Sequence, residues 1–201
     1  MDQYYVIGSP IDHSRSPKLH RQFAEQTGQD MAFDKMEVTT ETFARTMAHL
    51  KDQRVKGVAV TLPIKSIAYK HVNHADEASH LAKAVSMIAF DEKGKATGYN
   101  LDGFGMIQDI KVNHKEDLAG KRILLIGAGG AASGVLGPLL QENPASLTMV
   151  NRTAKNAKKL AKRFKDLGDI KLSTYDDLGS DFDVLINATS TSAQGICPPM
   201  P

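Results

Sequence analysis

The chain has 201 residues, of which 41% are hydrophobic and 24% charged, and its formal net charge is +2. This balance is ordinary for a globular protein and gives no large field of the kind that indicates a nucleic-acid or membrane partner. One cysteine, Cys197, excludes an internal disulfide framework, and neither a secretory signal nor a membrane-length apolar segment is visible, so we expect a cytoplasmic protein.

The first hundred residues alternate between strand and helix patterns. Ser16 and Pro17 predict the start of a helix, with Ser16 as its N-cap, and Gly28 predicts its end. A second helix is expected from about Thr40. The other elements expected here are strands at 4–8, 32–38 and 57–62, a mostly helical stretch at 64–84, and a hairpin of 86–90 with 96–99.

The second half of the chain alternates in the same way, which predicts parallel sheets covered by helices. We therefore expect an α/β fold: an N-terminal domain, 1–104, with a mostly parallel sheet, and a Rossmann-like domain, 105–201. A Rossmann-type sheet usually continues with further strands and a helix, so we expect the C-terminal part of this domain to be missing. The elements expected are strands at 121–126, 147–151, 170–173 and 183–188 and helices at 103–112, 130–141 and 154–167.

The clearest motif is a glycine-rich turn between an apolar strand and a helix. The turn, which follows Ile126, is Gly127-Ala128-Gly129-Gly130-Ala131. A Gly-x-Gly-x-x-Ala pattern lets the backbone approach a pyrophosphate, which then lies at the helix N-terminus. Such turns also occur in ordinary loops, but the strand before it and the helix after it favour a dinucleotide site.

The residues after the next strand indicate which dinucleotide is bound. An NAD site needs a carboxylate there for the ribose 2′-hydroxyl, and this chain has Asn151-Arg152-Thr153 instead. A guanidinium binds a 2′-phosphate with two parallel hydrogen bonds. The sequence therefore favours NADP over NAD.

Polar residues follow the strands of the first domain, where open α/β sheets bind their ligands. Ser14 and Ser16 could hydrogen-bond a carboxylate at a helix start, although Ser16 also fits a plain N-cap. Lys65 falls in the first turn of a helix, opposed by the macrodipole, which favours an acid or base over a surface charge. Asp102 either caps the following helix or faces Lys65 and pairs with it and with a substrate hydroxyl.

These segments, taken together and in this order, resemble the shikimate dehydrogenase family. No single motif is as specific as the combination, which covers nearly the whole chain. The matching segments are Gly-x-Pro-Ile-x-His-Ser-x-Ser-Pro at 8–17, Val-Thr-x-Pro-x-Lys at 60–65, Asn-x-Asp-Gly at 100–103, Gly-Ala-Gly-Gly-Ala at 127–131, Asn-Arg-Thr at 151–153 and Asn-Ala-Thr-Ser at 187–190.

The resemblance implies an oxidoreductase that reversibly reduces 3-dehydroshikimate to shikimate with NADPH, on the route to chorismate and the aromatic amino acids. It implies that Lys65 and Asp102 are the catalytic pair, with Lys65 as proton donor and acceptor. The substrate-binding residues that it implies are Ser14, Ser16, Thr61 and Ser86. The cofactor-binding residues that it implies are Gly127, Ala128, Gly129, Gly130, Ala131, Asn151, Arg152 and Thr153, with Lys155 as a possible second cation.

Four residues depart from the family pattern close to these positions. Ala59 and Ser86 stand where the family usually has asparagine, and Met87 and Leu101 where it has threonine. Serine is shorter than asparagine and has a single oxygen. We therefore expect weak binding of shikimate, or preference for a related ring acid such as quinate.

Other classes of function are less well supported. The basic run at 155–165 suggests nucleic acid, but its apolar residues share one helical face, as in an ordinary amphipathic helix. The histidines show no metal-ligand spacing, so we expect no metal. A non-catalytic NADP- or metabolite-sensing relative, monomeric or homodimeric like the enzyme, is the main alternative, and retention of both Lys65 and Asp102 favours the enzyme.

Overall fold

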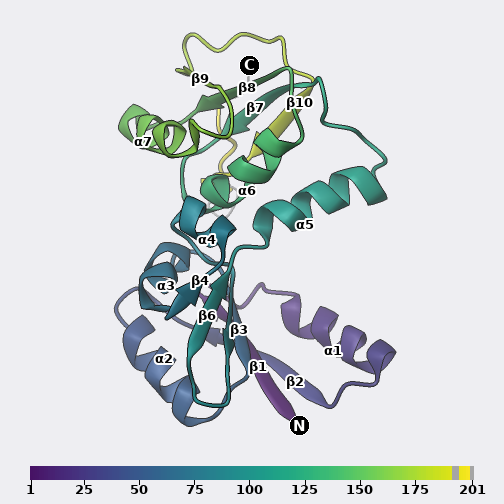
Figure 1. Cartoon of the computed structure of the whole chain (residues 1–201), viewed down its shortest axis with the longest axis vertical. Helices are drawn as coiled ribbons and strands as arrows, with labels where there is room; N and C mark the ends of the chain where they lie inside the picture. The colour runs from purple at the N-terminus through teal and green to yellow at the C-terminus, as the bar shows by residue number, and fades with distance from the viewer. Residues whose placement is uncertain (192–194, 200–201) are drawn as a thin grey trace. The chain divides into compact units, whose positions relative to one another are not determined.

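The computed structural model describes residues 1–191 and 195–199. The chain forms two compact units, Met1–Leu101 and Asp102–Pro201, and each is an α/β structure (Figure 1). In the described part of the chain no helix is long and apolar enough to cross a membrane.

The first unit is built on a six-stranded mixed sheet with the order β2-β1-β3-β5-β6-β4. β1 pairs in parallel with β2 and β3, and β4 pairs in parallel with β6, whereas β5 is antiparallel to both of its neighbours. The predicted hairpin is confirmed, and Asp91 Oδ1 closes its turn by accepting from the Lys93 and Lys95 N–H groups. The strands are β1 (Asp2–Gly8), β2 (Met31–Glu37), β3 (Gly57–Val60), β4 (His74–Ala75), β5 (Met87–Phe90) and β6 (Ala96–Tyr99).

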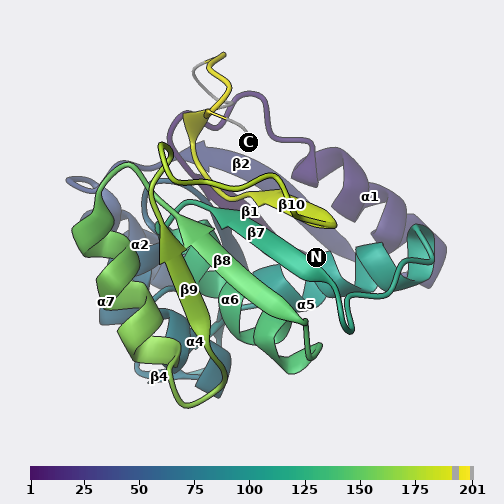
Figure 2. The same cartoon turned by 90° about the horizontal axis from the view of Figure 1, so that it is seen from above.

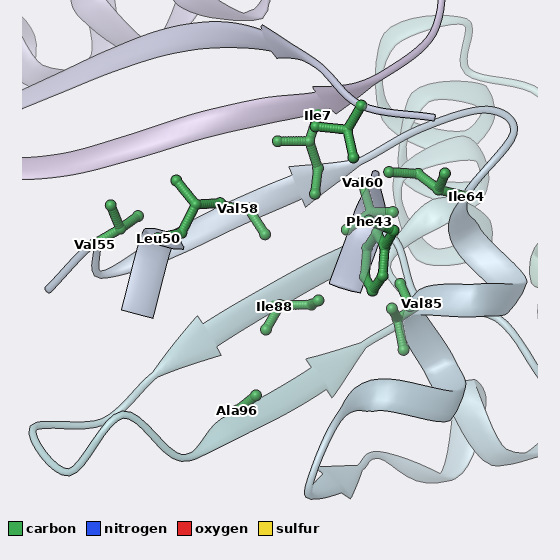
Figure 3. Close-up of a cluster of buried hydrophobic side chains, with 12 residues drawn as sticks. Ile7, Phe43, Leu50, Val55, Val58, Val60, Ile64, Val85, Ile88 and Ala96 are labelled. Carbon is green, nitrogen blue, oxygen red and sulfur yellow. The ribbon is translucent and has the colours of Figure 1, made fainter. Parts of the chain in front are cut away.

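Helices cover both faces of this sheet: α1 lies on one side, and α2 and α3 lie on the other (Figure 1). The α2 and α3 side holds the larger apolar core, in which Ile7, Val58 and Ile88 of the sheet pack under Phe43 and Leu50 of α2 (Figure 3). All five side chains are buried, so their removal from water is a main source of stability in this unit. The helices are α1 (Ser16–Thr27), α2 (Phe43–Asp52), α3 (Lys65–His71) and α4 (Glu77–Ala82).

Three local expectations need correction. The N-cap of α1 is Arg15, so Ser16 is the first helical residue and not the cap. The strand expected at 57–62 ends at Val60, and α3 begins at Lys65. The stretch 64–84 is not one helical region, because the two-residue strand β4 separates α3 from α4. The predicted end of α1 is confirmed, since Gly28 has a left-handed φ of 65°.

The second unit has a four-stranded, fully parallel sheet with the order β10-β7-β8-β9, seen side by side in Figure 2. Ile123, Leu124, Leu125 and Ile126 of β7 are all fully buried, as expected for a central strand covered on both faces. A π-helical turn, Asp109–Asn113, continues α5. The elements are α5 (Asp102–Gln108), β7 (Arg122–Ile126), α6 (Gly130–Gln141), β8 (Ser146–Val150), α7 (Ala154–Phe164), β9 (Ile170–Ser173) and β10 (Val184–Asn187).

Candidate active site

The carboxyl ends of β1 and β3 are joined directly through the backbone. The Ser9 N–H donates to the Leu62 carbonyl oxygen at 2.9 Å, and the Thr61 N–H donates to the Ile7 carbonyl oxygen at 3.0 Å. Gly8 lies between these two bonds, and a Cβ there would collide with the Leu62 carbonyl and the Thr61 methyl group. The close approach therefore requires glycine and brings the segment after β1 against the segment that carries Thr61.

Lys65 is tied by a backbone hydrogen bond to the segment that leads to Ser86. It is the first residue of α3 and is half-buried, and its carbonyl oxygen accepts from the Val85 N–H at 3.1 Å. The Ser86 carbonyl oxygen in turn accepts from the Val60 N–H at 2.8 Å. Thr61, Lys65 and Ser86 are thus held together by backbone bonds that cross between three segments of the first unit.

Ser14 lies in the loop between β1 and α1, Ser16 is the first residue of α1, and both are half-buried. The Ser14 N–H donates to the carbonyl oxygen of the buried Ile11 at 3.0 Å, and Ser14 Oγ accepts from the Ser16 N–H at 3.4 Å. This second contact is long, so it restrains the Ser14 hydroxyl only weakly. Both side chains therefore retain hydrogen-bonding capacity for a ligand.

Asp102 begins α5 and is half-buried, at the first residue of the second unit. The residue two places before it is buried: Asn100 donates from Nδ2 to the Ala84 carbonyl oxygen at 3.0 Å, and its N–H contacts Asp76 Oδ2 at 3.4 Å. The chain that leads to Asp102 is consequently fixed by side-chain bonds inside the first unit.

The glycine turn of the second unit has the geometry that a close approach to phosphate requires. Gly127 has a φ of +116°, and a Cβ on it would lie 2.8 Å from the Ala188 carbonyl oxygen, so only glycine fits. Gly129 is the N-cap of α6, and among the described residues beyond its two chain neighbours no atom lies within 4 Å of where its Cβ would be. The first N–H groups of a twelve-residue helix thus follow the exposed Gly129, which suits the pyrophosphate of a dinucleotide.

The loop after β8 presents the expected cation. Arg152, Thr153 and Lys155 are exposed, and Asn151 Nδ2 donates to the Thr153 carbonyl oxygen at 2.9 Å. Tyr175 lies near this loop: burial raises the pKa of its hydroxyl, and the positive charge of Arg152 acts in the opposite direction. Sequence reasoning missed Tyr175, because it belongs to no motif and comes close to Arg152 only through the pairing of β8 with β9.

Metal ligation has no support in the described part of the chain, where no group of three or more His, Cys, Asp or Glu side chains could hold an ion. The fold and these residues define an α/β protein with a Rossmann-type glycine turn in one unit and polar residues at strand ends in the other.

Comparison with known proteins gives this class its family. A model described as the shikimate dehydrogenase substrate binding domain matches residues 6–88, and one described as shikimate / quinate 5-dehydrogenase matches residues 109–197. The shikimate dehydrogenase (NADP(+)) of Cellvibrio japonicus (strain Ueda107) is 44% identical over 201 residues, which cover 100% of this chain and 72% of the relative. The chain belongs to the shikimate dehydrogenase family.

Solved structures agree with this assignment. An Ael1 enzyme from Pseudomonas putida is similar with a TM-score of 0.90 at 35% identity, over 100% of this chain and 74% of that one. Shikimate 5-dehydrogenase from Thermus thermophilus, solved in complex with NADP(H) and shikimate, has a TM-score of 0.84 at 26% identity, over 94% and 69% of the two chains. The predicted α/β fold and the predicted family are confirmed.

Proposed function

We propose that the protein catalyses the reversible, NADP-dependent reduction of 3-dehydroshikimate to shikimate, a step of aromatic amino-acid biosynthesis. The observation that carries the proposal is the glycine turn with buried Gly127 and exposed Gly129, together with exposed Arg152 after the next strand, in a chain of this family. The name of the Cellvibrio japonicus relative, which specifies NADP(+), supports the choice of cofactor.

In this proposal each domain binds one of the two reactants. Residues 1–104 bind the ring acid, and residues 105–201 bind NADP. Ser14, Ser16 and Thr61 contact the substrate carboxylate and hydroxyls, which is supported by the half-burial of all three side chains at the strand ends. Ser86, which the resemblance implies as a further substrate contact, has a hydroxyl that already accepts from the Leu101 N–H.

The cofactor residues fit the group that the family implies. The backbone from Gly127 to Ala131, including Ala128, Gly129 and Gly130, holds the pyrophosphate, because a glycine turn at the start of α6 directs N–H groups towards an anion. Asn151, Arg152 and Thr153 hold the 2′-phosphate, and Lys155 adds a second positive charge. When bound, NADP supplies the acceptor for the hydride that leaves the ring carbon.

The proton transfer is assigned to Lys65. During oxidation of the alcohol, Lys65 Nζ takes the hydroxyl proton, and during reduction it returns a proton to the developing alkoxide. Lys65 is the first residue of α3, and the dipole of this helix opposes a positive charge at its N-terminus. Asp102 accepts hydrogen bonds from the lysine and from a substrate hydroxyl, so that both keep the geometry for transfer.

The test is a comparison of ring acids and cofactors with purified protein. Shikimate with NADP⁺ should give NADPH, seen by its absorbance, and NAD⁺ should be far less effective. Quinate serves as the second substrate, and omission of any ring acid serves as the blank. If neither shikimate nor quinate supports the reduction of NADP⁺, the proposal is refuted and a non-catalytic NADP-binding protein is favoured. Faster reduction with quinate would reassign the substrate within the same chemistry.

A further inference from the structure

Ser86 joins three segments of the first unit through its own atoms. Its carbonyl oxygen accepts from the Val60 N–H, its N–H donates to the Tyr99 carbonyl oxygen, and its Oγ accepts from the Leu101 N–H, each at 2.8 Å. The residue thus binds the end of β3, the end of β6 and the residue that immediately precedes Asp102. No strand pairing supplies the last of these bonds, which depends on the serine side chain.

The hydroxyl has little capacity left for a ligand. A serine hydroxyl has one proton and two lone pairs, and the Leu101 N–H occupies one lone pair. The proton has an acceptor in the Tyr99 carbonyl oxygen at 3.5 Å, a long contact. Ser86 can therefore offer a ring hydroxyl one lone pair, or give up its contact with Tyr99.

Two residues next to Ser86, Met87 in the chain and Leu101 across its hydrogen bond, have apolar side chains. Met87 is 37% exposed and lies opposite Ala59 and Tyr99 in the strand register, and Leu101 is 43% exposed. A site that reads ring hydroxyls needs donors or acceptors at this position. The Ser86 hydroxyl is instead explained by its hydrogen bond to the Leu101 N–H.

We propose that Ser86 is a positioning residue: its hydroxyl holds the Leu101 N–H and thereby fixes the backbone at Asp102. The inference rests on the proposed function, in which Asp102 orients Lys65 and the substrate. Asn100 is already held by Ala84 and Asp76, so the Ser86 bond completes the restraint of the segment that enters α5. Loss of this bond should allow Asp102 to leave its catalytic geometry without removing a substrate contact.

The test combines the exchange rate of the Leu101 amide, measured by NMR, with the kinetics of shikimate oxidation. Ser86→Ala should raise the exchange rate about tenfold and lower kcat about tenfold, as expected for a lost hydrogen bond, with KM for shikimate within about twofold of wild type. Ser86→Thr, which keeps the hydroxyl, should have the exchange rate and the kcat of wild type. Ser180→Ala, at an exposed serine of the second unit, should change neither.

Two results would overturn the inference. One is a higher KM with unchanged kcat in Ser86→Ala, which is the behaviour of a substrate ligand. The other is a Leu101 amide that exchanges at the wild-type rate in that variant. Should Ser86→Ala fail to fold, Ser86→Cys gives the same comparison, because sulfur is a weak acceptor of similar position. If wild-type protein oxidises no ring acid, the proposed function fails, whereas the amide exchange still decides whether the bond to Leu101 exists.

Discussion

Asn151 Nδ2 donates a hydrogen bond of 2.9 Å to the carbonyl oxygen of Thr153, and this bond closes the short loop that carries Arg152. The loop follows β8 in the parallel sheet of the second unit, one strand away from the glycine turn after β7. Arg152 is exposed there, so its guanidinium is available to an anion. Arg152 alone can therefore distinguish NADP, which carries a 2′-phosphate, from NAD, which does not.

Arg152→Ala should weaken the binding of NADP⁺ and leave the binding of NAD⁺ nearly unchanged. A hydrogen bond to a charged group contributes about 1.5–3 kcal/mol, so KM for NADP⁺ should rise about 10- to 150-fold. Steady-state kinetics with both cofactors measures the effect. Lys159→Ala removes an exposed positive charge from α7 and is the control, with KM for NADP⁺ expected to stay within about twofold. Equal losses with NADP⁺ and NAD⁺ in Arg152→Ala would contradict the assignment.

Two glycines of α5 should respond to alanine with opposite signs. A Cβ on Gly103 would meet the Pro138 ring and lie 2.7 Å from the Gly134 carbonyl oxygen of α6, so Gly103→Ala should lower the free energy of unfolding by about 1–3 kcal/mol. Outside its own stretch of helix, a Cβ on Gly105 would meet no atom of the described residues within 4 Å, and Gly105→Ala should raise the free energy of unfolding by about 0.5–1 kcal/mol. Urea unfolding of both variants tests the packing of α5 on α6, and a neutral Gly103→Ala would refute it.

Ser86→Asn should improve the use of shikimate. An asparagine carbonyl can accept from the Leu101 N–H as the serine does, and its amide adds two donors for a ring hydroxyl. One added hydrogen bond contributes about 0.5–1.5 kcal/mol, so KM for shikimate should fall about 2- to 12-fold with kcat maintained. An unchanged or higher KM would show that Ser86 does not limit the affinity for shikimate.

His20 should make the stability of the first unit depend on pH. Its ring stacks on Phe33 with centroids 4.0 Å apart and planes 1° apart, and burial lowers the pKa of His20 below its ordinary value of 6.5. The unfolded chain therefore binds the proton first, so the stability from this group is complete above about pH 6.5 and is lost as the pH falls below it. Tm should decrease from about pH 7.5 to about pH 5.5.

The variant His20→Phe keeps a ring against Phe33 and removes the titration. Its Tm should fall less over the same pH range than that of wild type. His49→Gln, at an exposed histidine of α2, should retain the wild-type decrease. An identical pH dependence in His20→Phe and wild type would show that His20 does not contribute.

The elements with strong local signals could be predicted from the sequence. The run Ile123 to Ile126 is fully buried in the central strand β7, and the glycine turn follows it directly. Both features can therefore be recognised from consecutive residues of the sequence. The end of α1 at Gly28 was predictable for the same reason, because a left-handed residue there favours glycine.

The relations that were not predictable join residues from different elements. The bond between Ser86 and Leu101 depends on the antiparallel register of β5 with β6, and β4 exists only because His74 and Ala75 meet β6. The N-cap of α1 was missed because Arg15 has no side-chain capping bond, whereas Ser16 has the composition of a cap. Composition and spacing name the polar residues of the candidate site, and the strand register decides which of their atoms remain available.

The most direct measurement of the central claim is the rate of shikimate-dependent NADP⁺ reduction by wild type and by Lys65→Met, a change that keeps an unbranched side chain and removes its amine. Loss of a general acid or base should lower kcat about 10²- to 10⁴-fold, with KM for NADP⁺ unchanged because Lys65 is not among the cofactor residues. Equal kcat values for the two proteins, or a wild-type rate no higher than the blank without ring acid, would contradict the account.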